Sequence, residues 1–182
     1  MPLDSFDDSG HLYFITASVV EWYPLFDDER YTNVILDAFS VYRDRKDILL
    51  FAFVIMPSHI HFIAKPLKKT IGEFLQSFGS YTAHKLIGLL KEGKRMEVLS
   101  VLHEKRRDTR SNYSLWQELF TENIFTQKFL EQKLEYIHQN PVTKNAGAKD
   151  QRSDYLLSSA GYYDKGEKPI IAIDDIRDYL LK

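Results

Sequence analysis

Runs of apolar residues along the chain predict four strands. Residues 11–20 (HLYFITASVV) are rich in β-branched and aromatic side chains, which are typical of a strand. Residues 48–56 (ILLFAFVIM) are almost continuously apolar and predict a central strand that is covered on both faces. After a short break at Pro57-Ser58, residues 59–64 (HIHFIA) predict a partner strand, and so tight a connection favours an antiparallel hairpin. A fourth strand is expected within residues 115–125.

Apolar positions at helical spacing predict two long helices between these strands. The first covers about residues 30–44 and follows the acidic sequence Asp27-Asp28-Glu29, which suits a helix N-terminus. The second covers residues 71–90. Thr70 is a candidate N-cap for this helix, and Glu73 completes a capping box.

The remaining segments are less regular. Residues 126–139 predict a third strong helix, which is expected to end before Pro141 because proline disfavours helical geometry in the residue before it. Residues 91–112 are highly charged and are interpreted as a partly helical insertion. Residues 143–182 are interpreted as an appendage with one short helix near Tyr155–Tyr162.

The predicted order is strand, helix, strand, strand, helix, strand, helix. This order is typical of an α+β ferredoxin-like fold, in which an antiparallel sheet has helices packed on one face. We expect a single domain over residues 1–182, with a core at about 12–142 and a C-terminal extension at about 143–182. The fold by itself does not determine the function.

The composition excludes several classes of protein. There is no cysteine among the 182 residues, which excludes disulfides, thiolate metal sites and cysteine nucleophiles. No apolar run approaches the roughly 20 residues that a membrane span needs, and the acidic start of the chain lacks the plan of a secretory signal. A glycine-rich phosphate loop is absent, so no nucleotide cofactor is expected. We therefore expect a soluble cytoplasmic protein.

Charge is spread unevenly along the chain. The net charge is −2, which by itself disfavours a nucleic-acid-binding protein, because phosphate neutralisation needs clustered Lys and Arg. Residues 1–29 contain seven acids and no Lys or Arg, whereas the segment from Lys85 to Arg110 contains eight basic residues and four acidic ones. This segment is either a local basic surface or a set of solvated helix faces.

Two histidines lie two residues apart on the predicted third strand. Alternate side chains of a strand share a face, so the imidazoles of His59 and His61 are expected to point the same way, roughly 7 Å apart at their roots. This spacing allows both rings to reach one divalent ion, while Ile60 points to the other face. The alternative is a polar stripe at the sheet surface. The metal site is favoured by the position of the pair directly after a buried strand, where unpartnered ionisable rings are costly.

A tyrosine and two amides share a face of the last long helix. Gln139 and Asn140 follow Tyr136 at i+3 and i+4, so either amide oxygen could serve as a third metal ligand. His138 points about 200° away from Tyr136 and is a poor co-ligand. The alternatives are that Tyr136 is a packing residue and that Asn140 caps the helix end.

Two spaced motifs carry a resemblance to a known family. MPSHIHFIA at Met56–Ala64 and LEYIHQNPV at Leu134–Val142 resemble the IS200-like tyrosine transposases and their REP-associated relatives, which are HUH single-stranded DNA endonucleases. The opening sequence YFITASVVEWYPLF at Tyr13–Phe26 is similar to the opening strand of that family. The likeness spans most of residues 12–163, and the two motifs occur in the family's order.

The resemblance implies a complete catalytic site. His59 and His61 match the metal ligands, Tyr136 matches the nucleophile, and Asn140 matches the polar residue that completes the metal site. It further implies Mg²⁺ or Mn²⁺, a homodimer, a nucleoid-associated location, and single-stranded DNA with hairpin ends as the partner. The expected reaction is DNA nicking and joining through a 5′-phosphotyrosine, which conserves the energy of the broken phosphodiester and needs no ATP.

The remaining assignments concern DNA contact and proton transfer. The phenol of Tyr136 needs a proton acceptor, for which a water, Glu135 and Gln132 are candidates. Tyr81 or Trp116 could stack on unpaired bases. The basic residues expected to contact DNA are Lys65, Lys68, Lys69, Arg106, Arg107 and Arg110. Two other functions remain open: a non-catalytic or domesticated nucleic-acid-binding module with a ferredoxin-like sheet, and a metal-dependent hydrolase of small phosphates.

Overall fold

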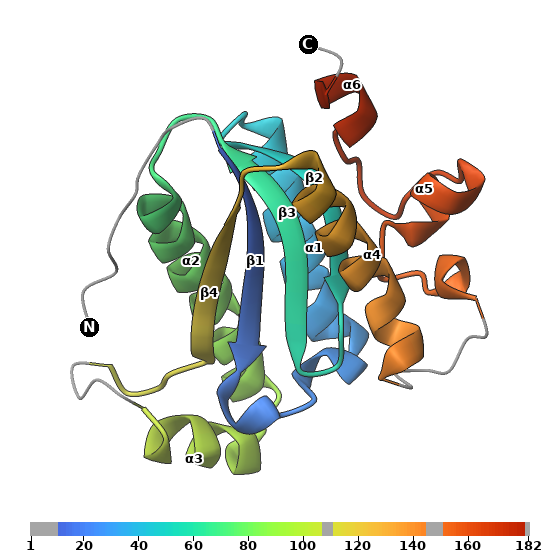
Figure 1. The fold of residues 1–182 in the computed structure, drawn as a ribbon. Coiled ribbons are helices and arrows are strands. Elements are labelled where there is room, and N and C mark those ends of the chain that lie inside the picture. The colour runs from blue at the N-terminus through green and yellow to red at the C-terminus, as the bar shows by residue number, and fades with distance from the viewer. Residues whose placement is uncertain (1–10, 107–110, 145–150, 181–182) are drawn as a thin grey trace.

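A four-stranded antiparallel sheet forms the centre of the protein (Figure 1). The structure is a computed structural model that describes residues 11–106, 111–144 and 151–180. The strands follow the order β2-β3-β1-β4, in which neighbours are antiparallel, as in a ferredoxin-like sheet. All four predicted strands are confirmed, with bounds β1 (Leu12–Val19), β2 (Ile48–Ile55), β3 (His59–Pro66) and β4 (Trp116–Ile124).

Two long helices, α1 (Glu29–Asp44) and α2 (Ile71–Glu92), cover one face of this sheet. Their apolar sides meet the sheet in an aromatic core, where the ring centroid of Phe39 lies 5.0 Å from that of Phe62 and 5.7 Å from that of Phe78. The predicted capping box of α2 is confirmed by reciprocal hydrogen bonds between Thr70 and Glu73. Within the three described stretches, no helix has both the length and the apolar character needed to cross a membrane.

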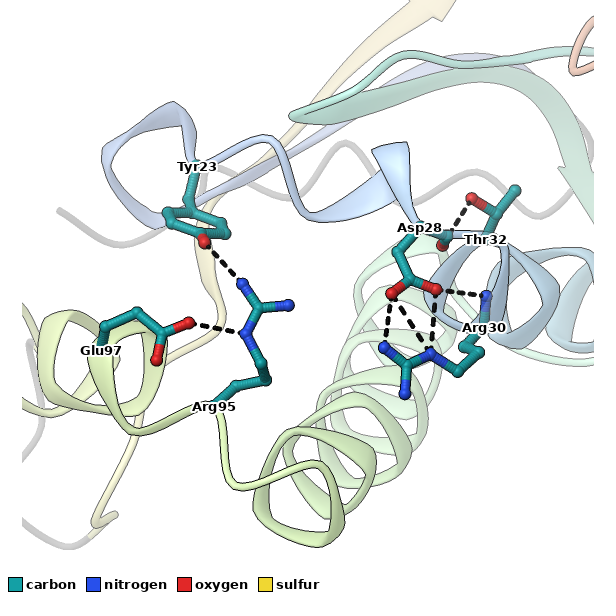
Figure 2. Close-up of polar contacts among 6 residues, drawn as sticks. All are labelled: Tyr23, Asp28, Arg30, Thr32, Arg95 and Glu97. Carbon is teal, nitrogen blue, oxygen red and sulfur yellow. Dashed lines mark hydrogen bonds and ion pairs between the residues drawn. The ribbon is translucent and has the colours of Figure 1, made fainter.

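A short connection after β1 holds the start of α1 and of α3 in place. It contains the 3₁₀ turns η1 (Val20–Trp22) and η2 (Leu25–Asp27). Figure 2 shows the Asp28 carboxylate accepting hydrogen bonds from the backbone and guanidinium of Arg30, and Arg95 bridging Glu97 to the hydroxyl of Tyr23. α3 (Met96–Glu104) supplies the helical part expected within residues 91–112.

The last long helix, α4 (Gln127–Thr143), packs on the opposite face of the sheet from α1 and α2. Its buried residues Leu130 and Ile137 join a second core cluster that includes Leu12, Phe14 and Val54. The α+β antiparallel fold is therefore confirmed, but the prediction that the helices pack on one face is wrong for α4. The reason is visible in β1, where both Phe14 and its neighbour Ile15 are buried, so the strand needs cover on both faces.

Helix α4 also continues past Pro141, which corrects the expected helix end. Proline has no N–H to donate to the preceding turn and disfavours helical geometry before it. The turn is nevertheless closed by a bond from the Lys144 N–H to the Asn140 carbonyl at 3.0 Å and by the Thr143 hydroxyl on the Gln139 carbonyl at 3.1 Å. Asn140 therefore lies within a helical turn and is not its terminal residue.

Strand β2 lies at the edge of the sheet, so the prediction of a central position is wrong. Its apolar run is nonetheless buried, because the C-terminal segment covers its outer edge (Figure 1). The Ile55 N–H bonds the Leu157 carbonyl at 2.8 Å, and the Ser159 N–H bonds the Phe53 carbonyl at 3.0 Å. This segment contains η3 (Arg152–Asp154), α5 (Ala160–Lys165) and α6 (Ile176–Leu180). The short helix expected near residues 155–162 thus begins only at Ala160, because the residues before it pair with β2.

Candidate active site

The histidine pair lies on the sheet face beneath α4. The strand register places each histidine in line with side chains of the neighbouring strands. On β1, Thr16 lies opposite His61 of β3, and Ser18 lies opposite His59. On the other side of β1, Phe120 of β4 lies opposite Thr16, and Glu118 lies opposite Ser18. Because directly opposed residues of an antiparallel pair point to the same face, these side chains all face α4.

The two imidazoles lie together, as the strand spacing predicted. Their ring centroids are 4.8 Å apart. The Nδ1 atom of His61 is 2.8 Å from the hydroxyl of Thr16, and the Nδ1 atom of His59 is 3.2 Å from the hydroxyl of Ser58. Both rings therefore have one nitrogen occupied by a hydroxyl, which fixes their orientation. The Nε2 atom of His61 is buried and has no hydrogen-bond partner among the described residues.

Helix α4 places Tyr136 and Asn140 over this pair. The ring centroid of Tyr136 lies 5.1 Å from that of His61 and 5.7 Å from that of Phe14, and its side chain is 47% exposed. Asn140, one turn further along the helix, is buried, and in the described structure its Oδ1 atom has no hydrogen-bond partner. Gln139 is exposed instead. Of the two amides, Asn140 is therefore the one directed into the site.

Both histidines are held in the neutral form. The pKa of His59 is lowered to about 4, mainly by burial and also by the nearby charge of Lys144, while an interaction with the Asn140 amide acts in the opposite direction. Burial also lowers the pKa of His61 to about 3, with smaller contributions from His59 and Lys133. Neutral imidazoles are the form that binds a metal ion, so both rings are available as ligands at neutral pH.

A cleft of about 530 Å³ opens onto these residues. Its walls include three groups that the sequence did not single out: Lys133 and Lys144 on the α4 side, and Glu122 on β4. Lys133 forms an ion pair with Glu122, and its ammonium lies 4.4 Å from the ring centroid of Phe14. Lys133 was detectable from the sequence, because it precedes Tyr136 by three residues on the same helix. Glu122 was not, because its position depends on strand register.

The described residues contain no cluster of three or more His, Asp or Glu side chains suited to a metal ion. A metal held here would therefore rely on the two histidines and on an amide or water oxygen. Glu135, one of the residues considered as a proton acceptor, forms an ion pair with Arg152 of the C-terminal segment. His138 forms a 2.9 Å hydrogen bond with the Ser159 hydroxyl and, as expected, is not part of the pair.

The structure places the four described candidates for DNA contact away from this cleft. Lys65 lies at the other end of β3 from His59, about 20 Å away at the usual rise of a strand, and its ammonium bonds the Tyr179 hydroxyl at 2.9 Å. Lys68 pairs with Asp47, and Lys69 is exposed on the same loop. Arg106 donates to the carbonyl of His103. Arg107 and Arg110 lie outside the described residues.

The two aromatic residues considered for base stacking lie on the α1/α2 side. The Trp116 ring packs in the core cluster of that side, and its indole N–H donates to the Thr82 hydroxyl on α2 at 3.1 Å. Tyr81 is on α2 itself, with its ring 6.3 Å from that of Tyr42. Neither lines the cleft that contains Tyr136.

Comparison with known proteins identifies the fold. No family model matches the chain, and no curated protein sequence matches it. A solved structure of a REP-associated tyrosine transposase bound to a REP hairpin is similar, with a TM-score of 0.62 and 18% sequence identity over 97% of this chain and 93% of that chain. A candidate transposase from Deinococcus radiodurans R1 has a TM-score of 0.47 and 13% identity, over 76% of this chain and 97% of that chain. The first likeness shows that this chain has the fold of the tyrosine transposase.

Proposed function

We propose that this protein is a metal-dependent single-stranded DNA endonuclease and strand transferase of the transposase type, acting on DNA ends that carry hairpins. The observation that carries the proposal is the meeting of an exposed phenol, Tyr136, with two neutral imidazoles, the half-buried His59 and the buried His61. The fold shared with a transposase that binds a hairpin supports the same conclusion. A nucleic-acid-binding module without catalysis would not need an unpartnered imidazole nitrogen beneath an exposed phenol.

The donor set fits a divalent ion. His59, His61 and Asn140 would hold Mg²⁺ or Mn²⁺, because the buried Nε2 of His61 and Oδ1 of Asn140 have no partner in the described part of the chain. A structural zinc site would normally use four protein ligands, and this set has three. A bound ion would polarise the scissile phosphate and offset the charge that grows on its oxygens.

Tyr136 supplies the nucleophile. Its phenolic oxygen attacks the phosphorus and loses its proton to water, while the 3′ oxygen of the neighbouring nucleotide leaves and takes up a proton. The product is a 5′-phosphotyrosine and a free 3′-hydroxyl. Attack by a second 3′-hydroxyl reverses the chemistry and joins the strands. Because Glu135 is held by Arg152 and Gln132 is a neutral amide, we assign the proton acceptor to water.

All of these groups come from one chain. Tyr136 reaches His61 of the same molecule, so a second copy is not needed to complete the site. We propose the homodimer that the sequence resemblance implies as an assembly of complete sites. We also propose that residues 1–182 form one domain, because the C-terminal segment bonds the edge of β2 and so belongs to the same folded unit.

The test is covalent capture of DNA. Labelled single strands that carry a hairpin are incubated with the protein and Mn²⁺ and separated on a denaturing gel. We expect a protein–DNA band that is lost in Tyr136→Phe, whereas Tyr136→Phe still binds the strand. Tyr81→Phe, on the opposite side of the sheet, is the matched control and should keep the band.

The alternatives give different outcomes in the same assay. A binding module gives no covalent band with any variant. A hydrolase of small phosphates gives metal-dependent turnover of a phosphate ester that Tyr136→Phe leaves intact. Either result overturns the proposed function.

A further inference from the structure

Two large aromatic rings stand exposed at the cleft without a packing role that explains them. Trp22 is 52% exposed and Phe120 is 45% exposed, and both line the cleft that contains Tyr136. The indole of Trp22 lies edge-on to His59, with ring centroids 5.3 Å apart. Phe120 lies two strands from His61, across Thr16. Exposed apolar groups gathered around polar chemistry indicate a binding surface.

The backbone is held in an unfavourable conformation to present Trp22. Glu21 and Trp22 both have positive φ, at 55° and 52°, which is uncommon for bulky residues and costs free energy unless the surroundings enforce it. The Glu21 N–H bonds the side chain of Gln117 at 2.9 Å, and the Glu21 carboxylate pairs with Lys105 at 3.2 Å.

The residue after Trp22 is fixed as well. The hydroxyl of Tyr23 accepts a hydrogen bond from Arg95 at 3.2 Å, as Figure 2 shows. The Tyr23 N–H also bonds the Val20 carbonyl. The strained turn is therefore held from both sides, and the group that it directs into the cleft is an indole.

The charges around the cleft favour stacking as the main source of affinity. Among the residues that the structure describes, the cations on its walls are Lys133 and Lys144, and the acids are Glu118 and Glu122, of which Glu122 is paired with Lys133. The net charge of the chain is −2. A protein that bound DNA mainly through phosphate neutralisation would need many more cations at this place. Base stacking on aromatic rings contributes affinity without them.

We propose that Trp22 and Phe120 form a stacking platform for the unpaired bases next to the phosphate that Tyr136 attacks. This inference rests on the proposed function, because it takes single-stranded DNA as the substrate. Both faces of a base in a duplex are already covered by its neighbours, so the platform selects unpaired nucleotides. It therefore gives the site a preference for single strands without reading their sequence.

The experiment compares DNA with and without bases. A short labelled oligothymidylate and an abasic oligonucleotide of the same length and charge are titrated with the protein in the presence of a chelator, and binding is followed by fluorescence anisotropy. Trp22→Ala, Trp22→Phe and Phe120→Ala are compared with the parent chain. Phe125→Ala is the matched control, because Phe125 is 71% exposed but lies beyond the far end of β4. Circular dichroism checks that each variant is folded.

Stacking predicts that Trp22→Ala and Phe120→Ala each weaken binding of the oligothymidylate by about 5- to 100-fold, whereas Trp22→Phe keeps most of the affinity. With the abasic strand, Trp22→Ala and the parent chain should bind equally, because the base that the ring contacts is gone. If Trp22→Ala lost the same affinity for both oligonucleotides, or lost affinity for neither, the proposed stacking platform would be overturned. This binding result is independent of the covalent band, so failure of the platform and failure of the proposed function are distinguishable.

Discussion

Thr16 is not a metal ligand in the proposed site, but its hydroxyl orients the imidazole of His61, which is one. Its hydroxyl lies 2.8 Å from Nδ1 of His61 and so leaves Nε2 directed into the site. Partners of this kind orient a metal-binding imidazole and typically change metal affinity or activity by 10- to 100-fold.

Removing this hydroxyl should weaken the metal site. We expect Thr16→Val, which keeps the shape of the side chain, to lower the affinity for Mn²⁺ by roughly 10- to 100-fold, as measured by calorimetric titration. Thr121→Val is the control, because Thr121 lies opposite Ile15 on the other face of the sheet. If the two variants bound Mn²⁺ equally well, Thr16 would have no role in orienting His61.

Titration with Mn²⁺ can also show which of the two amides after Tyr136 is the metal ligand. Asn140 is buried with an unpartnered oxygen, whereas Gln139 is exposed. We expect Asn140→Ala to lower the Mn²⁺ affinity at least about tenfold, because a ligand is lost, and Gln139→Ala to leave it within about twofold. The reverse result would assign Gln139 as the third ligand.

The relative placement of two site residues was predictable from the sequence where both belong to the same strand or helix. His59 and His61 share a face because strands repeat every two residues, and Asn140 follows Tyr136 by one helical turn. Thr16 is 45 residues from His61, and its contact depends on how β1 aligns with β3. Trp22 depends on a left-handed backbone at two residues, neither of which is Gly, Asn or Asp. Such positions follow from tertiary structure and carry no local signal.

Among the elements, the C-terminal segment bonds both α4 and the edge strand β2. The hydroxyl of Ser159 bonds Nε2 of His138 at 2.9 Å and accepts from the Phe53 N–H at 3.1 Å. One buried hydroxyl therefore joins α4, the edge strand β2 and the C-terminal segment. Arg152 adds an ion pair from the same segment to Glu135 of α4.

Loss of this hydroxyl should destabilise the whole fold. In Ser159→Ala, the Phe53 N–H and the His138 nitrogen are left buried without a partner, at about 1–3 kcal/mol each. We expect the free energy of unfolding to fall by about 2–4 kcal/mol in urea titrations. Ser100→Ala, on the exposed face of α3, should change it by less than about 0.5 kcal/mol. A loss of similar size in both variants would mean that Ser159 does not join the three elements.

The positions of the helices and strands along the chain were largely predictable, whereas the segments that pack against each strand were not. Periodicity and capping residues correctly placed α1, α2 and the strands, because these signals are local. The apolar run of β2 indicated burial on both faces, but the same pattern fits a central strand and an edge strand covered by another segment. Local signals also placed the end of α4 too early, because the bonds that continue it past Pro141 come from residues after the proline.

For the whole molecule, the α+β antiparallel fold followed from the order of elements, although the edge position of β2 did not. The opposite positions of α2 and α4 did not, because the sequence gives the apolar face of a helix but not which side of the sheet it meets. Within the described part of the chain, the expected basic surface also has no counterpart at the cleft, where two lysines face two glutamates. These charges surround two imidazoles, those of His59 and His61, that are neutral at neutral pH.

Two buried histidines, His61 and His138, and the half-buried His59 should make the fold sensitive to mild acid. Burial lowers the pKa of His59 and of His138 to about 4 and that of His61 to about 3, from an ordinary value of 6.5. As the pH falls below 6.5, the unfolded chain takes up protons at these positions and the folded chain does not, so stability is complete above 6.5 and is lost towards pH 4. Each histidine then contributes a loss of up to about 2 kcal/mol by pH 5.

Urea titrations between pH 7.5 and 4.5, with a chelator present, measure this loss directly. The carboxylates of Asp28 and Asp175 have pKa values lowered by their arginine partners, so they titrate below this range and do not obscure it. His138→Gln should reduce the slope of stability against pH by about one third, because two of the three shifted histidines remain, even though the variant is less stable at neutral pH. A parent chain whose stability is flat from pH 7 to 5 would show that the imidazoles are not neutral and buried, and the metal site inferred from them would lose its basis.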